Sequence, residues 1–345
     1  MASKMMQWSV DTPNQDFGGM SYAEAPVPSV GENEVLVKFQ AASLNFRDLA
    51  IAKGTFPFAH KYPIVPASDG AGVVVEVGSR VREFKKGDAI LTIFNQAHQF
   101  GDIDPYAASS GVGGTIDGTL RQYGIYPELG LVKAPKNLDA VEASTLPCAA
   151  LTSWNALYGL KSLKPGQIVL VQGTGGVSIF GLQFAKAAGA TVIATTSSAG
   201  KAERLKQMGA DHVINYKTTP NWGEAARQLT PNQAGVDYII EVGGQGTLEQ
   251  SLKCIKMDGI ISVIGFLGSS DKPQPGLLEA LSNICTVRGV YVGSRAMFQQ
   301  MVQAIEATDL HPVVDSHVFS LEQTKQAYEH MAAQKHFGKV VVKIE

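Results

Sequence analysis

Apolar and polar positions follow different patterns in the first third and in the middle of the chain. Up to about residue 131 the sequence is rich in glycine, proline and β-branched residues and has few helical periods. Glu34–Phe39 alternates polar and apolar residues, which is typical of a half-buried strand. Gly70–Gly78 and Ala89–Phe94 are predicted strands as well. This region is therefore expected to form a β-rich, barrel-like module.

From residue 141 onward the chain alternates helices and strands. Apolar residues at helical spacing predict one helix over Glu142–Leu157, and Pro165 and Gly166 end that pattern. Six strands are predicted after it: Gln167–Gln172, Thr191–Thr195, His212–Asn215, Val236–Glu241, Gly259–Ile264 and Thr286–Val292. The intervening helices are Val177–Ala188, Lys201–Met208, Trp222–Leu229 and Gly246–Ile255. Near-continuous apolar strands in such an alternation predict an α/β, doubly wound parallel six-stranded sheet of the Rossmann type.

The tail carries two helical patterns, Arg295–Thr308 and Leu321–Ala333, and a strand, Val340–Ile344. It is too short for a domain, so we expect it to fold back onto the N-terminal module. The predicted organisation is a β-rich domain over residues 1–130, completed by 293–345, into which a dinucleotide-binding domain over 131–292 is inserted.

Composition limits the classes of partner. The 345 residues are 45% hydrophobic and 17% charged, with a net charge of −2 and no long run of one sign, so no nucleic-acid partner is expected. No segment has the roughly 20 apolar residues that span a bilayer, and the first ten residues do not resemble a secretory signal. Three cysteines are too few for a disulfide framework, which favours a reducing, cytoplasmic location.

A glycine-rich segment connects the first strand of the alternation to its helix. It reads Gly173-Thr174-Gly175-Gly176-Val177, with Ser178 at the third position of the usual pattern. One glycine permits a tight turn, the next lets the backbone approach a pyrophosphate, and the helix N-terminus offers free N–H groups. This context predicts a dinucleotide site.

The end of the second strand distinguishes the two nicotinamide cofactors. NAD-binding chains place a carboxylate there, on the ribose 2′-hydroxyl. Here Thr195–Lys201 has hydroxyl groups and a lysine and no acidic residue, so NADPH is predicted, with Ser197 and Lys201 at its 2′-phosphate. The alternative, in which Ser197 caps the next helix and Lys201 is a solvated surface charge, is compatible with this role.

Several further motifs occur in a family-specific order. They are Ser43–Asp48, Pro66–Gly72, Asp117–Leu120, Leu146–Trp154, the glycine loop, Met208–Tyr216 and Phe337–Val341. Over nearly its whole length the chain resembles the medium-chain dehydrogenase/reductase superfamily, in particular its zinc-independent, quinone-oxidoreductase-like branch. The resemblance implies that the β-rich domain is GroES-like.

The zinc ligands of the metal-dependent members are replaced. The resemblance puts Asn45 at the first ligand position and Ser68 at the second, and Cys148 alone retains a ligand type. One thiolate cannot hold zinc, which requires four ligands, or three and a water. No metal is therefore expected, and Cys148 is expected to be a packed thiol.

Without a Lewis acid, reduction of an electrophilic acceptor is favoured over oxidation of an alcohol. The predicted function is NADPH-dependent hydride transfer to a small-molecule quinone or α,β-unsaturated carbonyl. Two alternatives stay open: a zinc-free alcohol or aldehyde oxidoreductase of the same fold, and a non-catalytic NADPH-binding protein.

The resemblance assigns roles to individual residues. It places Asn45 near the nicotinamide ribose and the substrate, Thr152 beside the nicotinamide, and Tyr216 at the adenosine end. Asp48 is expected to orient Asn45 or relay a proton. The structural alternatives are a turn asparagine, a helix-start carboxylate, a core threonine and a strand-end aromatic residue.

Further cofactor contacts are expected where later strands end, because the carboxyl ends of parallel strands face the cofactor. Those candidates are Val242, Gly265, Phe266, Leu267, Ser294, Arg295 and, more weakly, Lys339. No proton donor stands out: His60, Tyr62 and water are the candidates. Asn95–Gly114 is expected to be a loop at the substrate pocket. The resemblance implies a homodimer in which the sixth strand, Thr286–Val292, lies at the sheet edge and pairs with its copy.

Overall fold

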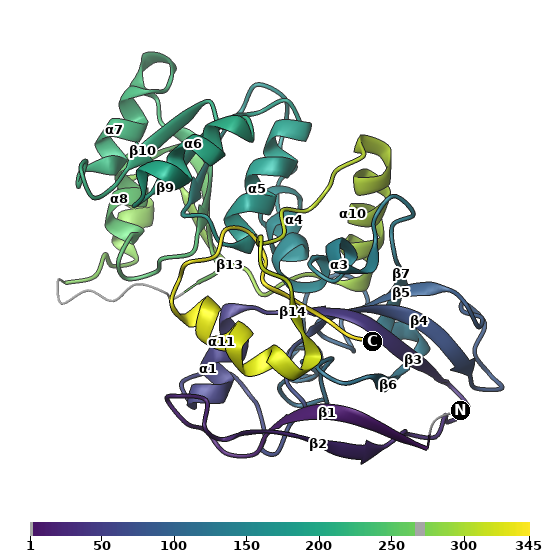
Figure 1. Ribbon diagram of the computed structural model, residues 1–345. Coiled ribbons are helices and arrows are strands. Elements are labelled where there is room, and N and C mark those ends of the chain that lie inside the picture. Colours follow the sequence, from purple (N-terminus) through teal and green to yellow (C-terminus); the bar gives the residue numbers. More distant parts are fainter. Residues whose placement is uncertain (1–2, 266–272) are drawn as a thin grey trace. The chain divides into compact units, whose positions relative to one another are not determined.

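The computed structural model describes residues 3–265 and 273–345, and the chain divides into two compact units (Figure 1). Unit 1 comprises Met1–Leu151 and Gly293–Glu345, and unit 2 comprises Thr152–Val292. The first division thus follows residue 151 and not the expected residue 130. The reason is that β7 (Leu131–Lys133) pairs with β5 (Ala89–Thr92), which keeps this segment in unit 1.

Unit 1 is built on a seven-stranded sheet to which both ends of the chain contribute. Its strand order is β14-β15-β3-β4-β5-β7, with β6 also paired to β3. The tail therefore folds back as predicted: β15 (Val341–Lys343) runs antiparallel beside β3 (Glu34–Ser43). The remaining strands are β4 (Asp69–Val77), β6 (Tyr123–Pro127), β14 (Phe319–Ser320) and the separate hairpin β1 (Lys4–Val10) and β2 (Met20–Pro26).

Helices cover the core of unit 1, whose buried side chains come from both chain ends. Tyr328 and Phe17 pack edge to face with centroids 5.5 Å apart, and Trp8 donates its indole N–H to the carbonyl of Leu321 over 2.6 Å. The helices are α1 (Phe46–Lys53), α2 (Pro105–Ala108), α3 (Ala140–Ala143), α10 (Arg295–Thr308) and α11 (Thr324–Ala332). Short 3-10 turns lie at Glu128–Gly130 and Leu321–Gln323.

Unit 2 has the predicted six-stranded parallel sheet, in the order β10-β9-β8-β11-β12-β13. This is the strand order of a dinucleotide-binding domain, with the change of direction at β8 and β11. The strands are β8 (Ile168–Gln172), β9 (Thr191–Thr196), β10 (His212–Asn215), β11 (Val236–Glu241), β12 (Ile255–Val263) and β13 (Thr286–Gly289).

The helices of unit 2 cover both faces of this sheet (Figure 1). On one face α5 lies so close that a Cβ at Gly181 would meet Ile240 at 2.3 Å. On the other face Trp222 and Leu252 join a core with Leu170 and Ile239. The helices are α4 (Leu151–Tyr158), α5 (Gly176–Ala187), α6 (Ala199–Gln207), α7 (Trp222–Gln228), α8 (Leu248–Cys254) and α9 (Leu278–Ser282), with a 3-10 turn at Pro231–Gln233.

The helix predicted over Glu142–Leu157 is interrupted. The structure has α3, then a π-helical turn over Leu146–Ala150, then α4. Pro147 lies in the first turn of the π segment, where it lacks the N–H that a continuous helix needs. The apolar periodicity is retained across the break because the segment is buried.

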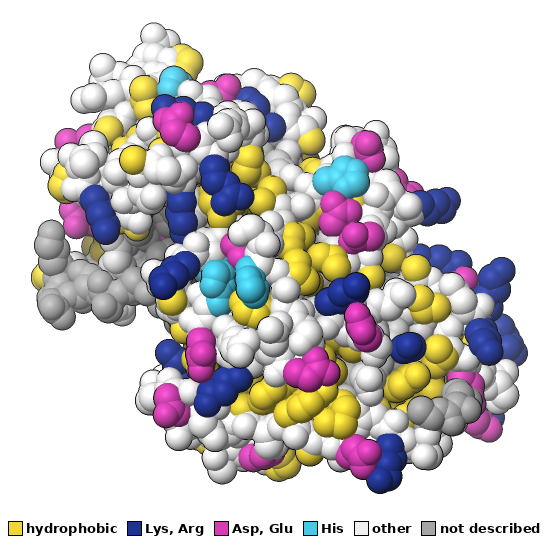
Figure 2. Space-filling model, in the orientation of Figure 1, with side chains coloured by type: hydrophobic (Ala, Val, Ile, Leu, Met, Phe, Trp, Pro, Cys, Tyr) yellow, Lys and Arg dark blue, Asp and Glu magenta, His cyan; other side chains and the backbone are white. Residues whose placement is uncertain are grey.

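The surface carries no field of one charge on the face shown in Figure 2, where basic and acidic side chains are interspersed. Within residues 3–265 and 273–345, no helix is both long and apolar enough to cross a membrane.

Candidate functional site

The carboxyl ends of neighbouring parallel strands meet at one edge of unit 2. The loop after β8 carries the glycine-rich segment, Ser197 follows β9, Tyr216 follows β10, and Val242 follows β11. In this fold that edge is where a dinucleotide lies. The structure therefore gathers the predicted cofactor residues of unit 2 at one edge. Phe266 and Leu267 lie outside the described residues.

The glycine loop has the geometry that a pyrophosphate requires. Gly173 has φ +76°, a region that favours glycine. A Cβ at Gly175 would meet no protein atom within 4 Å, so packing within the protein does not require a glycine there. Gly175 is also the N-cap of α5, and no side chain caps that helix. The N–H groups of Gly176 and Val177 at the start of α5 are thus available to phosphate oxygens.

The second strand end has hydroxyl groups and no acidic side chain. Ser198 and not Ser197 caps α6: its Oγ accepts the backbone N–H of Lys201 over 3.4 Å. The capping alternative proposed for Ser197 is therefore wrong by one residue. Tyr216 is 41% exposed and donates its backbone N–H to Thr196 over 3.0 Å, so it lies beside the end of β9.

A buried carboxylate that the sequence pattern did not single out links the ends of β8 and β11. Glu241 is fully buried at the end of β11 and accepts from Gln172 Nε2 (2.7 Å) at the end of β8. It also accepts the backbone N–H groups of Gly243 (2.9 Å) and Gly244 (3.0 Å). Gln172 Oε1 in turn accepts the N–H of Val242 over 3.2 Å. The sequence did contain a signal for this residue, because Glu241 is a charged side chain at the end of an otherwise apolar strand.

Unit 1 contains a second cluster, formed where three adjacent strands bring distant residues together. In the pairing of β3 with β4, Ser43 lies opposite Asp69, and in the pairing of β15 with β3, Val341 lies opposite Ser43. Asn45 follows β3 and Lys339 precedes β15. Lys339 Nζ donates to Asn45 Oδ1 over 2.5 Å and to Asp69 Oδ2 over 3.3 Å.

Asp48 shapes the start of α1, which Asn45 caps. Its Oδ2 accepts the backbone N–H of Asn45 over 2.8 Å, and its Oδ1 lies 3.4 Å from Arg47 Nη1. Burial raises the pKa of Asp48 to about 6, although the charge of Arg47 acts in the opposite direction. Asp48 is thus both a helix-start carboxylate and a residue that orients the backbone of Asn45.

Other predicted residues have structural partners or lie apart. Ser294 is buried and caps α10 by accepting from Met297 N. Arg295 is 8% exposed, and its guanidinium binds Glu83 Oε2 (2.5 Å) and the Leu131 carbonyl (2.9 Å) within unit 1. The guanidinium of Arg295 is therefore buried and engaged within unit 1. Thr152 is buried in α4.

The two proton-donor candidates are held by backbone carbonyls. Tyr62 donates its hydroxyl to Ile51 over 2.5 Å, and His60 Nδ1 lies 2.7 Å from the Phe58 carbonyl. The expected loop over Asn95–Gly114 contains α2, which Asp104 caps.

The residues at the expected metal-ligand positions do not suit zinc. Asn45 and Ser68 are hydrogen-bonded to each other over 3.4 Å, and a buried ammonium group contacts the same amide. The pKa of the Cys148 thiol is raised, mainly because burial disfavours the thiolate that would bind a metal. Among the described residues, no group of three His, Cys, Asp or Glu side chains is placed to hold a metal ion.

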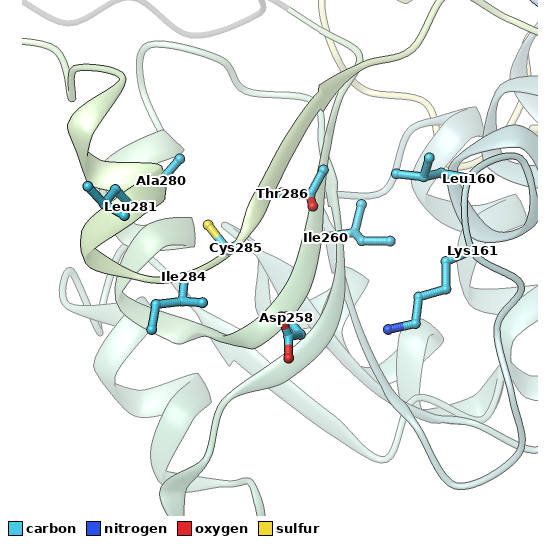
Figure 3. A pocket seen from close by; sticks show the side chains of 9 residues that line it. All are labelled: Leu160, Lys161, Asp258, Ile260, Ala280, Leu281, Ile284, Cys285 and Thr286. Atoms are coloured by element: carbon cyan, nitrogen blue, oxygen red, sulfur yellow. The ribbon is translucent and has the colours of Figure 1, made fainter.

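Unit 2 also has an open depression, whose lining side chains are shown in Figure 3. Its volume is about 540 Å³, and it is lined by Asp258 and Ile260 of β12, by Thr286 at the start of β13, by Leu281 of α9 and by Cys285. Since cofactors bind at carboxyl ends, this depression is not assigned to the dinucleotide.

Comparisons with known proteins agree with this geometry. The alcohol dehydrogenase GroES-like domain family matches residues 31–136, and the zinc-binding dehydrogenase family matches residues 176–307. The chain is 48% identical to a zinc-type alcohol dehydrogenase-like protein of Schizosaccharomyces pombe, covering 95% of this chain and 96% of that one. It is 31% identical to the 2-methylene-furan-3-one reductase of Solanum lycopersicum, covering 99% and 79%.

A solved structure has the same architecture throughout. The crystal structure of a putative alcohol dehydrogenase from Sinorhizobium meliloti matches with a TM-score of 0.90 at 40% identity, covering 99% of each chain. The chain belongs to the medium-chain dehydrogenase/reductase superfamily. It is an oxidoreductase of the alcohol dehydrogenase-like kind, with a nicotinamide cofactor.

Proposed function

We propose that the chain is an NADPH-dependent, zinc-independent reductase that transfers a hydride to a quinone or an α,β-unsaturated carbonyl. The observation that carries this proposal is the buried contact of Lys339 with Asn45 and Asp69 at the expected metal position. A divalent cation placed there would be repelled by the ammonium group and would find amide and hydroxyl groups where a metal-dependent enzyme has thiolate and imidazole.

The preference for NADPH is supported by the strand end in unit 2. The segment that follows β9 has Ser197, Ser198 and the lysine of the first turn of α6, and it lacks a carboxylate that would repel a 2′-phosphate. Charge-assisted bonds from hydroxyl and ammonium groups suit a phosphate dianion.

In this proposal NADPH, bound at the glycine loop, supplies the hydride. A new C–H bond forms at the β-carbon of the acceptor, and the electrons of its C=C bond move toward the carbonyl oxygen. The amide of Asn45 donates a hydrogen bond to that oxygen and stabilises its developing negative charge. The α-carbon then takes a proton from water, since His60 and Tyr62 are held by backbone carbonyls.

We further propose that the chain forms a homodimer through β13. This strand lies at the edge of the six-stranded sheet, and its Val287 side chain is 42% exposed. Leu277, Leu278 and Leu281, in and beside α9, are 96%, 75% and 73% exposed. No strand within residues 3–265 and 273–345 pairs with the outer side of β13, and such an edge next to apolar side chains suits a second copy of itself.

The deciding experiment is steady-state NADPH oxidation by chelator-dialysed protein against quinones, enones, alkenals and simple aldehydes, with NADH as the control. The proposal expects turnover of quinones or enones that prefers NADPH and is unchanged by added zinc. Activity that appears only with zinc would overturn it. Turnover of simple aldehydes alone would favour the alcohol or aldehyde oxidoreductase, and tight NADPH binding without turnover would favour the non-catalytic binder.

A further inference from the structure

The ammonium group of Lys339 is almost completely enclosed within unit 1. Its side chain is 3% exposed, and Nζ donates to the carbonyl of Leu44 (2.8 Å), to Asn45 Oδ1 (2.5 Å) and to Asp69 Oδ2 (3.3 Å). An ammonium group has three N–H donors and no acceptor. All three donors are therefore used inside unit 1, which leaves none for a cofactor phosphate.

This contact fixes which way the Asn45 amide points. The oxygen and nitrogen of a carboxamide have nearly the same shape, so only the hydrogen-bond network decides between its two orientations. Because Lys339 can only donate, the amide oxygen must face it, and Nδ2 must face the other side.

The remaining bonds close a ring in which both arms run from Lys339, the donor, to Asp69, the acceptor. Asn45 Nδ2 donates to Ser68 Oγ over 3.4 Å, and Ser68 Oγ donates to Asp69 Oδ1 over 2.7 Å. Asp69, as a carboxylate, only accepts, and it also accepts from Lys339. The donor-only ammonium and the acceptor-only carboxylate thus set the direction of every bond in the ring. Reversing the amide would break two of these bonds.

The ring leaves one amide hydrogen of Asn45 outside it. Asn45 is half-buried, whereas Ser68, Asp69 and Lys339 are buried, so Asn45 is the most exposed residue of the ring. We propose that Lys339, with its charge balanced by Asp69, is a positioning residue that presents the second Nδ2 hydrogen of Asn45 to the carbonyl oxygen of the substrate. This inference rests on the proposed function, in which Asn45 binds that oxygen.

The test removes both charges together, because an unpaired buried charge would itself disturb folding. The Lys339→Met/Asp69→Asn protein is compared with wild type and with Lys335→Met, a matched control that removes an exposed lysine four residues earlier. We expect kcat for an enone to fall about 100-fold, the lower end of the range for loss of an oriented oxyanion donor. We expect the NADPH dissociation constant to stay within about twofold, because Lys339 has no free donor for the cofactor.

Coupling to Asn45 distinguishes positioning from a separate structural effect. Asn45→Ala should lower kcat by a similar factor, and adding it to the double variant should cause no further loss. The proposal would be overturned if the loss of kcat in the combined variant were the product of the two separate losses. It would also be overturned if the NADPH dissociation constant rose together with the loss of kcat. Ser68→Ala, which opens the ring and retains both charges, is the second variant and should cause a smaller loss of kcat.

A spectroscopic readout keeps this test independent of the proposed function. In ¹⁵N-correlated NMR spectra, the two side-chain N–H signals of Asn45 are assigned as the pair that disappears in Asn45→Ala. It should shift in Lys339→Met/Asp69→Asn and stay in place in Lys335→Met. If wild type reduces no acceptor, the proposed function fails, and this shift still decides the orientation. An unmoved pair overturns the role of Lys339 even in an active enzyme.

Discussion

The carboxylate of Asp48 accepts the backbone N–H of Asn45 at 2.8 Å while it is 1% exposed, so a charge is enclosed at the start of α1. Burial raises the pKa of Asp48 from 3.8 to about 6, so the folded state binds its proton more tightly than the unfolded chain does. The stability contributed by the protonated form is fully present below pH 4 and is lost as the pH rises through 6.

Asp48→Asn should remove this dependence and retain an acceptor for the N–H of Asn45. Between pH 4 and pH 6 the free energy of unfolding of wild type should fall by about 2 kcal/mol relative to the variant. Urea denaturation across that range measures it. Asp102→Asn, at an exposed aspartate, is the control and should parallel wild type. Parallel curves for Asp48→Asn as well would contradict the assignment.

Glu241 should affect both stability and cofactor binding. Glu241→Leu removes a buried acceptor shared by Gln172 and the backbone N–H groups of Gly243 and Gly244, so we expect a loss of about 3 kcal/mol in the free energy of unfolding. The NADPH dissociation constant should rise roughly 10-fold because the loops after β8 and β11 lose their common anchor. Thermal denaturation and fluorescence titration measure the two effects. Glu224→Gln, at an exposed position of α7, should change neither.

A substitution of Gly175 should affect cofactor binding and not the stability of the fold. Since a Cβ there meets no protein atom within 4 Å, Gly175→Ala should leave the melting temperature unchanged or slightly raised. The same methyl group would lie where the pyrophosphate approaches, so NADPH affinity should fall at least about 10-fold. Gly276→Ala, at another position with open space, should leave affinity intact. Unchanged affinity in Gly175→Ala would place the phosphates elsewhere.

Ser197 and Lys201 should determine the choice of cofactor. A carboxylate in Ser197→Asp repels the 2′-phosphate and accepts from a 2′-hydroxyl, so the ratio of kcat/KM for NADPH to that for NADH should fall about 100-fold. Lys201→Ala should weaken NADPH alone, and Lys164→Ala, at an exposed lysine before β8, should weaken neither. Equal effects of Ser197→Asp on both cofactors would argue against the assignment.

The dimer proposal predicts that a charge at the outer edge of β13 prevents dimer formation. Val287→Lys places a charge at the outer edge of β13, where it opposes pairing with a second strand. Light scattering coupled to size exclusion should give a dimer for wild type and a monomer for the variant, with an unchanged circular dichroism spectrum. Lys161→Ala, at an exposed residue of unit 2, should remain dimeric. A wild-type monomer would refute the proposal.

The parallel sheet could be predicted because its strands are continuous apolar runs, and β10 and β11 have the predicted limits. The hairpin of β1 and β2 was missed because its mixed polarity and its long connection give no clear period. The break near Pro147 was missed because burial keeps the apolar spacing across it.

In the candidate site, too, the features that are local in the sequence could be predicted and the long-range contacts could not. The glycine loop is local in sequence, so its geometry could be predicted, whereas Lys339 and Asp69 are 270 residues apart. Only strand pairing brings these two residues together, and pairing cannot be derived from the local pattern. The same applies to Arg295 and Glu83, which are 212 residues apart.

The position of β15 in the sheet determines an order of events during synthesis. Unit 2 is one continuous stretch, so it can fold as soon as the ribosome has released it. The sheet of unit 1 has to wait, because β14 and β15 are translated after all of unit 2. Lys339 arrives with that last strand, one peptide bond from the carbonyl of Val340 that accepts the N–H of Leu44. A nascent chain therefore acquires its cofactor-binding half first and the ring around Asn45 last.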